Sequence, residues 1–213
     1  MNVAVYTAIF GGRDTFNEPP AGEFDFYLFT DDDSIRSKRA LVLTRPGPMI
    51  DPTRSARVYK VLSHELFPKY DYTLWIDGNI VLKSVDVDGL IKKYLDGVNL
   101  ATFKHPFREC IYDEAKVCAS LLKDDPELIA AQMEKYRKEK YPEKNGLVET
   151  GVLLRRNAPD VTEFNKVWWN EIENGSRRDQ LSFNYAAWKT GLKFALFDGT
   201  LDALGFELRN HLR

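Results

Sequence analysis

The chain has 213 residues, of which 44% are hydrophobic and 13% aromatic, so it can form the core of one large domain. Its 30 lysines and arginines are offset by 32 aspartates and glutamates, and the formal net charge of −2 excludes a general electrostatic attraction to nucleic acid or to an anionic membrane. Binding of a phosphate group would therefore need a local site.

The first residues and the cysteine content predict a soluble, cytoplasmic protein. The N-terminal segment turns glycine-rich and charged by residue 11 and lacks the basic start of a signal peptide. No apolar run approaches the roughly 18 residues that cross a bilayer. Cys110 and Cys118 do not have zinc-ligand spacing, so we expect two reduced thiols. We expect a single domain over residues 1–213, which could be the N-terminal part of a longer polypeptide. We also expect it to be monomeric, to have no nucleic-acid partner and not to insert into membranes.

Buried strands alternate with helices along the chain. Residues 2–9 are apolar or β-branched at nearly every position, which is typical of a strand buried on both faces of a parallel sheet. Further strands are predicted at residues 24–30, 40–44, 72–76 with a continuation at 80–82, 98–104, 147–155 with an interruption at 149–151, and 192–197. Helices are predicted at residues 53–66, 85–95, 113–123, 126–140, 161–173 and 179–189. This alternation predicts an α/β fold whose ligand crevice lies at the carboxyl ends of the strands.

The strongest indication of chemistry is Asp77-Gly78-Asn79, directly after the buried strand 72–76. Oxygen-bearing side chains at positions i and i+2 converge on a hard divalent cation when the backbone bends at the glycine between them. Mn²⁺ or Mg²⁺ in such a site is shared with the diphosphate of a nucleotide. The alternative is a simple Asp-Gly hairpin turn, and the surrounding motifs favour the binding site.

The loop after the first strand is one of these motifs. It contains the nucleotide-binding candidates Thr7, Ala8, Phe10, Gly12 and Arg13. Glycines allow a ligand to approach the backbone closely, and an arginine can reach a phosphate. The spacing matches neither a Walker A loop nor a complete dinucleotide fingerprint, so this loop alone is a weak indication.

Two further segments carry charges that suit a nucleotide. Asp31, in an acidic turn after the second strand, could bind a base or ribose, or could equally cap a helix. Arg57, Lys60 and His64 share one face of the helix 53–66. This face is either solvated or, if it enters the crevice, neutralises a diphosphate leaving group.

Polar residues in the second half of the chain complete the candidates. Lys104 and His105 lie where a strand ends and a loop begins, and Pro106 restricts the backbone of that loop. Glu149 lies in an apolar strand, where a polar group is costly unless it has a partner. Asp179 and Gln180 begin a helix, where Asp179 is either a first-turn carboxylate or a site residue. A lone histidine such as His211 is usually exposed and idle, but it can also bind a metal.

Seven segments, in this order, resemble glycosyltransferases of the A-type (GT-A) fold. More closely, they resemble a glycosyltransferase-like domain family once catalogued as a domain of unknown function and found in plants, bacteria and large algal viruses. The segments are residues 6–14, 24–32, the Arg57 and Lys60 helix with 64–71, 74–80, 103–115, 146–157 and 177–183. They span almost the whole chain. The resemblance implies a mixed, mostly parallel central sheet flanked by helices.

The resemblance also implies roles for the candidate residues. GT-A enzymes bind Mn²⁺ or Mg²⁺ through an Asp-X-Asp motif, and Asp77-Gly78-Asn79 occupies its place with one aspartate replaced by Asn79. With one negative charge fewer, we expect weaker metal binding. The layout is also similar to glycosyltransferase family 8, which implies His211 as a third ligand and Asp179 and Gln180 near the anomeric carbon. Lys104, His105 and Glu149 would then line the sugar and acceptor side.

The activity implied by the resemblance is a metal-dependent, retaining transfer of a hexose or deoxyhexose from a UDP-sugar to a glycan or glycoprotein acceptor, such as a viral capsid glycan. The alternative is a catalytically weak domain that only binds a nucleotide sugar, which Asn79 suggests. A nucleotidyltransferase is disfavoured because the loop GGRDTFNEPP lacks the lysine of an activation loop. The sequence leaves the sugar, the acceptor and the linkage open.

Overall fold

In the computed structural model, which describes residues 1–211, seven strands form one central sheet in the order β3-β2-β1-β4-β7-β6-β8. The strands are β1 Val3–Ile9, β2 Asp25–Thr30, β3 Ala40–Thr44, β4 Tyr72–Ile76, β6 Leu100–Lys104, β7 Val148–Arg156 and β8 Ala195–Leu196. Strands β1 to β4 are parallel, and β6 is parallel to β8. Only β7 is antiparallel to its neighbours, β4 and β6. The expected mixed, mostly parallel sheet is therefore confirmed.

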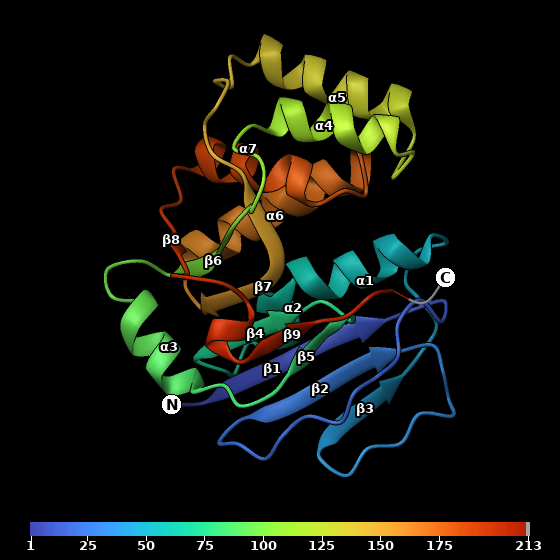
Figure 1. Cartoon of the computed structure of the whole chain (residues 1–213), viewed down its shortest axis with the longest axis vertical. Coiled ribbons are helices and arrows are strands. Elements are labelled where there is room, and N and C mark those ends of the chain that lie inside the picture. Colours follow the sequence, from blue (N-terminus) through green and yellow to red (C-terminus); the bar gives the residue numbers. More distant parts are fainter. Residues whose placement is uncertain (212–213) are drawn as a thin grey trace.

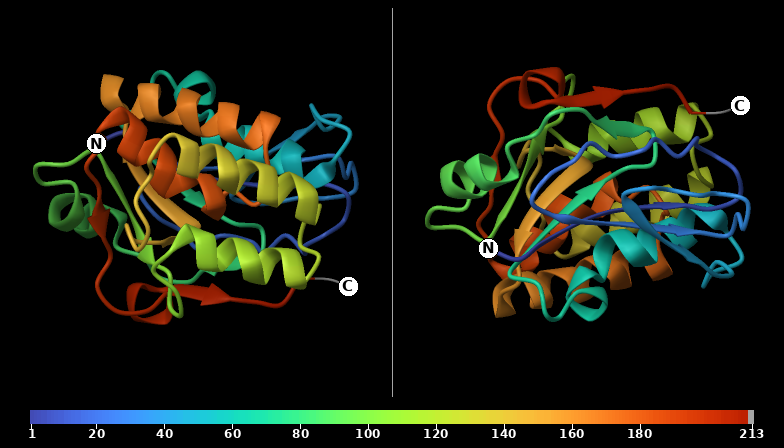
Figure 2. Two further views of the ribbon diagram at one scale, coloured as in Figure 1. Left: turned by 90° about the horizontal axis from the view of Figure 1, so that it is seen from above. Right: turned by 90° about the horizontal axis from the view of Figure 1, so that it is seen from below.

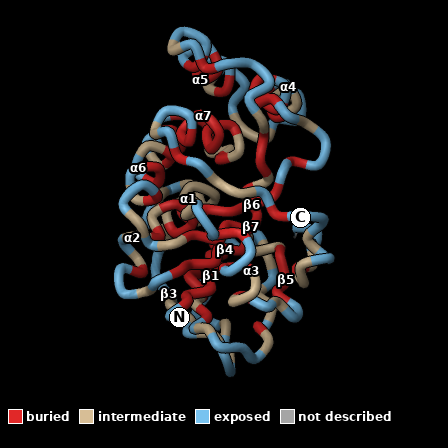
Figure 3. The backbone as a smooth tube through the Cα atoms, turned by 90° about the vertical axis from the view of Figure 1, so that its left-hand side faces the viewer, coloured by how far each residue is buried: buried red, intermediate tan, exposed pale blue. Residues whose placement is uncertain are grey.

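Strand β1 is buried on both faces, as its apolar sequence predicts. Val3 and Val5 belong to the core on one side of the sheet, with helix α3 Val87–Tyr94, whereas Ala4 and Tyr6 belong to the core on the other side. The strands β1, β4 and β7 form the buried centre of the molecule (Figure 3). Because both faces of these strands are covered, the edge at the carboxyl ends of β1 and β4 is the part of the sheet that remains open for a ligand.

The remaining helices form two further layers (Figures 1 and 2). Helices α1 Pro52–Val61, α6 Pro159–Asn174 and α7 Gln180–Thr190 cover the Tyr6 face of the sheet, and α2 Ser63–Leu66 follows α1. Helices α4 Ile111–Ser120 and α5 Pro126–Lys138 pack against α7 through a separate apolar cluster. In Figure 1, α4 and α5 lie at one end of the molecule and β1 to β3 at the other.

Three elements differ from the sequence prediction. The helix predicted at 53–66 is split at Leu62, whose backbone leaves the helical region. Strand β7 is continuous, but its pairing with β6 is broken at the predicted interruption. Thr102 lies opposite Leu153 and Phe103 opposite Glu149, so residues 150–152 of β7 have no partner in β6. Residues 80–82 do not continue β4. They form β5 Ile80–Leu82, which pairs with β9 Phe206–Leu208 in a two-stranded sheet that was not predicted.

The pairing of β5 with β9 determines the path of the C-terminal segment. A short helical turn, η1 Asp202–Leu204, leads into β9, and Leu208 lies opposite Ile80. The Arg209 N–H donates to the carbonyl of Asn79, so the chain after β9 runs beside the tip of β4. Within residues 1–211, none of the helices is both long and apolar enough to pass through a membrane.

Candidate active site

A cleft of about 630 Å³ opens at the carboxyl ends of β1 and β4. Because β7 runs in the opposite direction, its first residues, not its last, reach this edge. The lining comes from the loop after β1 (within 8–14), the start of α1 (within 52–57), the tip of β4 (within 75–80), the start of β7 (149–151), the segment before α7 (177–180), residues 122–123, Leu208 and His211. Segments from the whole length of the chain therefore meet here.

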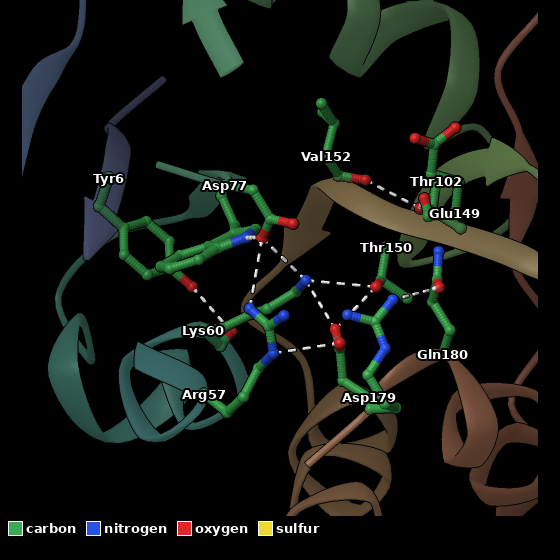
Figure 4. A network of polar contacts seen from close by, with 12 residues as sticks. Tyr6, Arg57, Lys60, Asp77, Thr102, Glu149, Thr150, Val152, Asp179 and Gln180 are labelled. Atoms are coloured by element: carbon green, nitrogen blue, oxygen red, sulfur yellow. Dashed lines mark hydrogen bonds and ion pairs between the residues drawn. The ribbon is translucent and has the colours of Figure 1, made fainter. Parts of the chain in front are cut away.

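Asp77 lies at the tip of β4 with one carboxylate oxygen fixed. Its Oδ1 accepts hydrogen bonds from Trp75 Nε1 at 2.8 Å and Lys60 Nζ at 2.9 Å, and Arg57 Nη1 lies 3.6 Å away (Figure 4). The backbone N–H of Asp77 donates to the carbonyl of Gly151. No residue of the described range donates to Oδ2. One oxygen thus anchors the side chain, and the other can bind a ligand.

Asp179 is almost completely buried beside Asp77. Its Oδ2 accepts hydrogen bonds from Lys60 Nζ and Thr150 Oγ1, both at 2.7 Å, and Arg57 Nε lies 3.1 Å from Oδ1 (Figure 4). Burial alone would raise the pKa of Asp179, but the charges of Arg57 and Lys60 outweigh it and hold the pKa far below its usual value. Asp179 is therefore a fixed negative charge beneath the cleft.

Lys60 joins the two aspartates from behind. Its side chain is 0% exposed, and its ammonium reaches Asp77, Asp179 and Thr150. Burial lowers the pKa of Lys60, and the two carboxylates oppose this shift. For Arg57, burial also opposes the charged form, but Asp179 and Asp77 prevail and raise the pKa. The two cations hold the carboxylates in position, and only Arg57 lines the cleft.

Glu149, at the start of β7, is a second kind of carboxylate. Burial and the negative charge of Asp77 raise its pKa, and Lys60 only partly opposes this. Its backbone carbonyl accepts a hydrogen bond from Thr102 Oγ1 at 3.0 Å. The side chain lines the cleft (Figure 4). Glu149 can therefore gain or lose a proton more readily than Asp179.

Asp14, Asn79 and His211 form the outer edge of the cleft. His211 Nδ1 lies 2.6 Å from Asp14 Oδ1, and Asn79 Nδ2 donates to the carbonyl of Arg209 at 3.0 Å. A Cβ atom on Gly78 would lie 2.9 Å from Asp14 Oδ2, so only glycine allows this approach. The sequence analysis missed Asp14, although it ends the segment 6–14 and directly follows Arg13.

These donors fit a hard divalent cation with help from a ligand. Within residues 1–211, no three His, Cys, Asp or Glu side chains converge as a metal site. The free Oδ2 of Asp77 and the amide oxygen of Asn79 are hard oxygen donors. His211 contacts Asp14 through Nδ1, which leaves Nε2 for a metal, an arrangement that often orients histidine ligands. Phosphate oxygens would have to complete the shell.

The comparison with known proteins decides the family. The family model described as "TOD1/MUCI70, glycosyltransferase-like domain" matches residues 29–201, most of the chain. The chain belongs to this family. This TOD1/MUCI70-type domain is 30% identical over 184 residues to the Arabidopsis thaliana protein named "Probable hexosyltransferase MUCI70", covering 75% of the chain and 31% of that protein. It is 26% identical over 220 residues to "Alkaline ceramidase TOD1" from the same plant, covering 86% of the chain and 47% of that protein.

The chain thus spans about a third and about half of the length of these two relatives. A solved structure shows the same fold in a glycosyltransferase. Mouse xyloside xylosyltransferase 1, in its apo form, superposes with a TM-score of 0.53 at 9% sequence identity, covering 92% of this chain and 84% of that one. At this identity the likeness concerns the fold alone.

Most of the predicted site residues of the TOD1/MUCI70-type domain meet in the cleft. They are Ala8, Phe10, Arg13, Arg57, Asp77, Gly78, Asn79, Glu149, Asp179, Gln180 and His211. Thr150 and Trp75 also contribute, because their side chains fix Asp179 and Asp77. Polar residues at strand ends are what made this group predictable from the sequence.

Six predicted residues do not line the cleft. Thr7 is buried within β1, and Gly12 lies in an exposed turn. Both carboxylate oxygens of Asp31 accept the backbone N–H of Gly11, so Asp31 fixes the loop after β1. Lys60 lies behind the cleft, as described above.

Lys104 and His105 are the other two. Lys104 is exposed and lies 3.8 Å from Glu109. The Nδ1 of His105 accepts hydrogen bonds from the backbone N–H groups of Phe107 and Arg108, which closes the turn after β6. His105, like Asp31 and Lys60, supports the fold around the cleft, a role that the sequence pattern does not distinguish from ligand binding.

Proposed function

We propose that this domain transfers a hexose from a nucleotide sugar, a UDP-sugar in our expectation, to a glycan acceptor. The observation that carries the proposal is the pair of aspartates around Lys60, one buried and permanently charged, the other holding a free oxygen at the tip of β4. The family, the hexosyltransferase relative and the transferase fold support the same class of reaction.

Our assignment of the parts of the donor follows the order of strands in the sheet. The loop after β1, with Phe10 and Arg13, suits the nucleoside and a phosphate. Asp77, Asn79 and His211, at the tip of the adjacent β4, would hold Mn²⁺ or Mg²⁺, which would stabilise the charge on the departing diphosphate. Gln180 and Glu149 lie next along the cleft and suit the sugar hydroxyls.

The charges of the site suit an oxocarbenium-like transition state. Asp179 stays ionised beside the position assigned to the sugar, so it stabilises positive charge at the anomeric carbon. Arg57, held by both aspartates, faces the leaving group. In a retaining reaction the leaving phosphate oxygen accepts the proton of the acceptor hydroxyl, so a dedicated base is not required.

Two alternatives follow from particular observations. The amide nitrogen of Asn79 is already bonded to Arg209, and a second aspartate is absent, which favours a domain that binds a nucleotide sugar but reacts slowly. The ceramidase name of one relative suggests amide hydrolysis of a lipid. The charged side chains that line the cleft, including Arg13, Asp14 and Arg57, suit a sugar nucleotide better than acyl chains.

The test is metal-dependent release of UDP from a panel of UDP-sugars, together with calorimetric binding of UDP in Mn²⁺. We expect Asp77→Asn, which keeps the side-chain shape, to lower the rate of UDP release by about 100-fold or more and to weaken UDP binding. Asp113→Asn, on the exposed side of α4, is the matched control and should retain both. Unchanged UDP affinity in a folded Asp77→Asn protein would refute the metal assignment.

A further inference from the structure

Two cationic side chains on one wall of the cleft lack a carboxylate partner. They are Lys123, in the connection between α4 and α5, and Arg178, just before α7. Among residues 1–211, no carboxylate oxygen lies within 4.0 Å of either cationic group. Arg178 donates to Gln180 Oε1 at 3.3 Å, and its Nε is shielded from solvent without a hydrogen-bond partner in the described range. A buried, unpartnered donor on a cationic group is costly unless a ligand satisfies it.

Two basic residues near the pair do have carboxylate partners. Arg177 lies 3.1 Å from Asp51 and 3.6 Å from Asp124, and Lys116 lies 2.9 Å from Asp113. Arg178 and Lys123 differ from these neighbours. We refer to these two side chains as the basic ledge.

Backbone and side-chain bonds hold the basic ledge in place. The Ser176 hydroxyl and the Arg177 N–H both donate to Asp124 Oδ2, at 2.7 and 2.8 Å. The Lys123 N–H donates to the carbonyl of Cys118, and Arg177 Nη2 reaches the carbonyl of Lys123 at 3.4 Å. The two segments that carry the ledge are thus tied together, so little conformational entropy is lost when a ligand binds.

Nearby carboxylates do not neutralise the ledge. Glu114 lies on the buried face of α4, where it pairs with Arg108 and also faces His105. Asp179 already accepts hydrogen bonds from Lys60 and Thr150 and pairs with Arg57, and the charge of Arg178 acts on it more weakly, from beyond 4.0 Å. The positive charge of the ledge is therefore available to a ligand in the cleft.

The ledge lies toward the helical end of the molecule, away from the loop after β1 (Figure 1). The sheet order β1-β4-β7-β6 places the loop after β1, to which we assigned the nucleoside, at one side and the tip of β4 next to it. Helices α4 and α7, which flank the ledge, lie beyond β7, at the opposite end of the molecule from β1 to β3 (Figure 1). On the proposed function, this is the side from which the acceptor enters.

We infer that the basic ledge binds an anionic group of the acceptor glycan, such as a carboxylate, sulfate or phosphate on a sugar unit. This inference rests on the proposed function for its assignment to the acceptor. The planar guanidinium of Arg178 suits the paired oxygens of such a group, and the ammonium of Lys123 adds a second charge. A neutral acceptor would leave both cations without a partner. The ledge selects acidic over neutral glycans.

The experiment compares acidic and neutral oligosaccharides on the full chain, by calorimetry at low salt and in the presence of UDP and Mn²⁺. The probes are an oligogalacturonate and a heparin-derived fragment, each a tetrasaccharide, and neutral cellotetraose. We expect the acidic probes to bind at least about tenfold more tightly than cellotetraose. Lys123→Ala and Arg178→Gln should each weaken acidic binding about three- to tenfold and leave UDP affinity within about twofold.

Lys116→Ala removes the same charge from the outer face of α4 and is the matched control, for which acidic binding should not change. Equal affinity for acidic and neutral probes would overturn the inference, and so would an equal loss in Lys116→Ala. A parallel loss of UDP affinity in the ledge variants would also overturn it, because the ledge would then bind the diphosphate. Failure of the proposed function appears separately, as wild-type protein that neither binds UDP nor releases it from UDP-sugars.

Discussion

Lys60 determines the geometry of two carboxylates from a position without solvent contact. Its ammonium lies 2.9 Å from Asp77 Oδ1 and 2.7 Å from Asp179 Oδ2. From the sequence, Lys60 looked like a candidate for direct contact with a diphosphate, because helical spacing places it on one face with Arg57. Spacing specifies which residues share a face, but burial depends on the packing of α1 against the sheet and α6. The sequence alone therefore could not show which basic residues of this face contact a ligand and which only support the site.

Replacing Lys60 with methionine tests this supporting role. Lys60→Met keeps the approximate length of the side chain but leaves the two carboxylates with Arg57 as their one shared cation, so we expect a loss of about 3–5 kcal/mol in the free energy of unfolding. Urea denaturation measures the loss. Adding Asp179→Asn to Lys60→Met should recover part of it, because Arg57 then has to balance only one carboxylate. A loss below about 1 kcal/mol for the single variant would contradict the role.

At the scale of elements, the strands were predictable and the C-terminal segment was not. Strand β1 has apolar or β-branched residues at consecutive positions, a pattern that few other structures share, and it lies within one residue of its predicted start. Strand β9 has three residues, of which only Phe206 is fully buried, so its sequence shows no recognisable alternation of apolar and polar residues. Its pairing with β5 depends on contacts across the length of the chain, which local patterns do not specify.

The tip of β4 provides the prediction at this scale. A methyl group at Gly78 would lie 2.9 Å from both Asp14 Oδ2 and Ile9 Cγ1, so Gly78→Ala must displace Asp14 or bend the tip. Because Asp14 holds His211, we expect the affinity for UDP in Mn²⁺ to fall by about tenfold. Calorimetry with and without Mn²⁺ measures the change. If affinity falls equally without metal, Gly78 acts on the nucleotide and not on the metal ligands.

The whole molecule combines a predictable architecture with a site that only the tertiary structure completes. The alternation of strands and helices was sufficient to predict the layered α/β fold, and the mouse transferase has the same fold at 9% identity. The site was predicted where polar residues follow strand ends, as at Asp77. It was missed where partners come from distant segments, as for Asp14 beside Gly78 and the Lys123–Arg178 pair.

The pH dependence of global stability follows from two shielded histidines. Burial lowers the pKa of both His64 and His105, although Glu65 and Glu114 respectively oppose the shift. Below the unfolded pKa of about 6.5, the unfolded chain takes up protons before the folded one, so stability falls as the pH decreases from 7.5 to 5.5. Urea denaturation at both pH values measures this loss.

His105→Asn identifies the contribution of one of these histidines. The asparagine oxygen can accept the same backbone N–H groups as Nδ1, but it does not titrate. We expect the variant to lose less stability than the wild type between pH 7.5 and 5.5. An identical pH dependence would show that His105 is not a source of the effect.

The pairing of β5 with β9 has a consequence for the order in which the protein forms during its synthesis. All seven strands of the central sheet precede residue 197, so residues 206–211 leave the ribosome after every strand of that sheet. Only when these residues emerge does Arg209 reach Asn79 and His211 reach Asp14. The outer edge of the cleft therefore forms only after all strands of the central sheet have been synthesised.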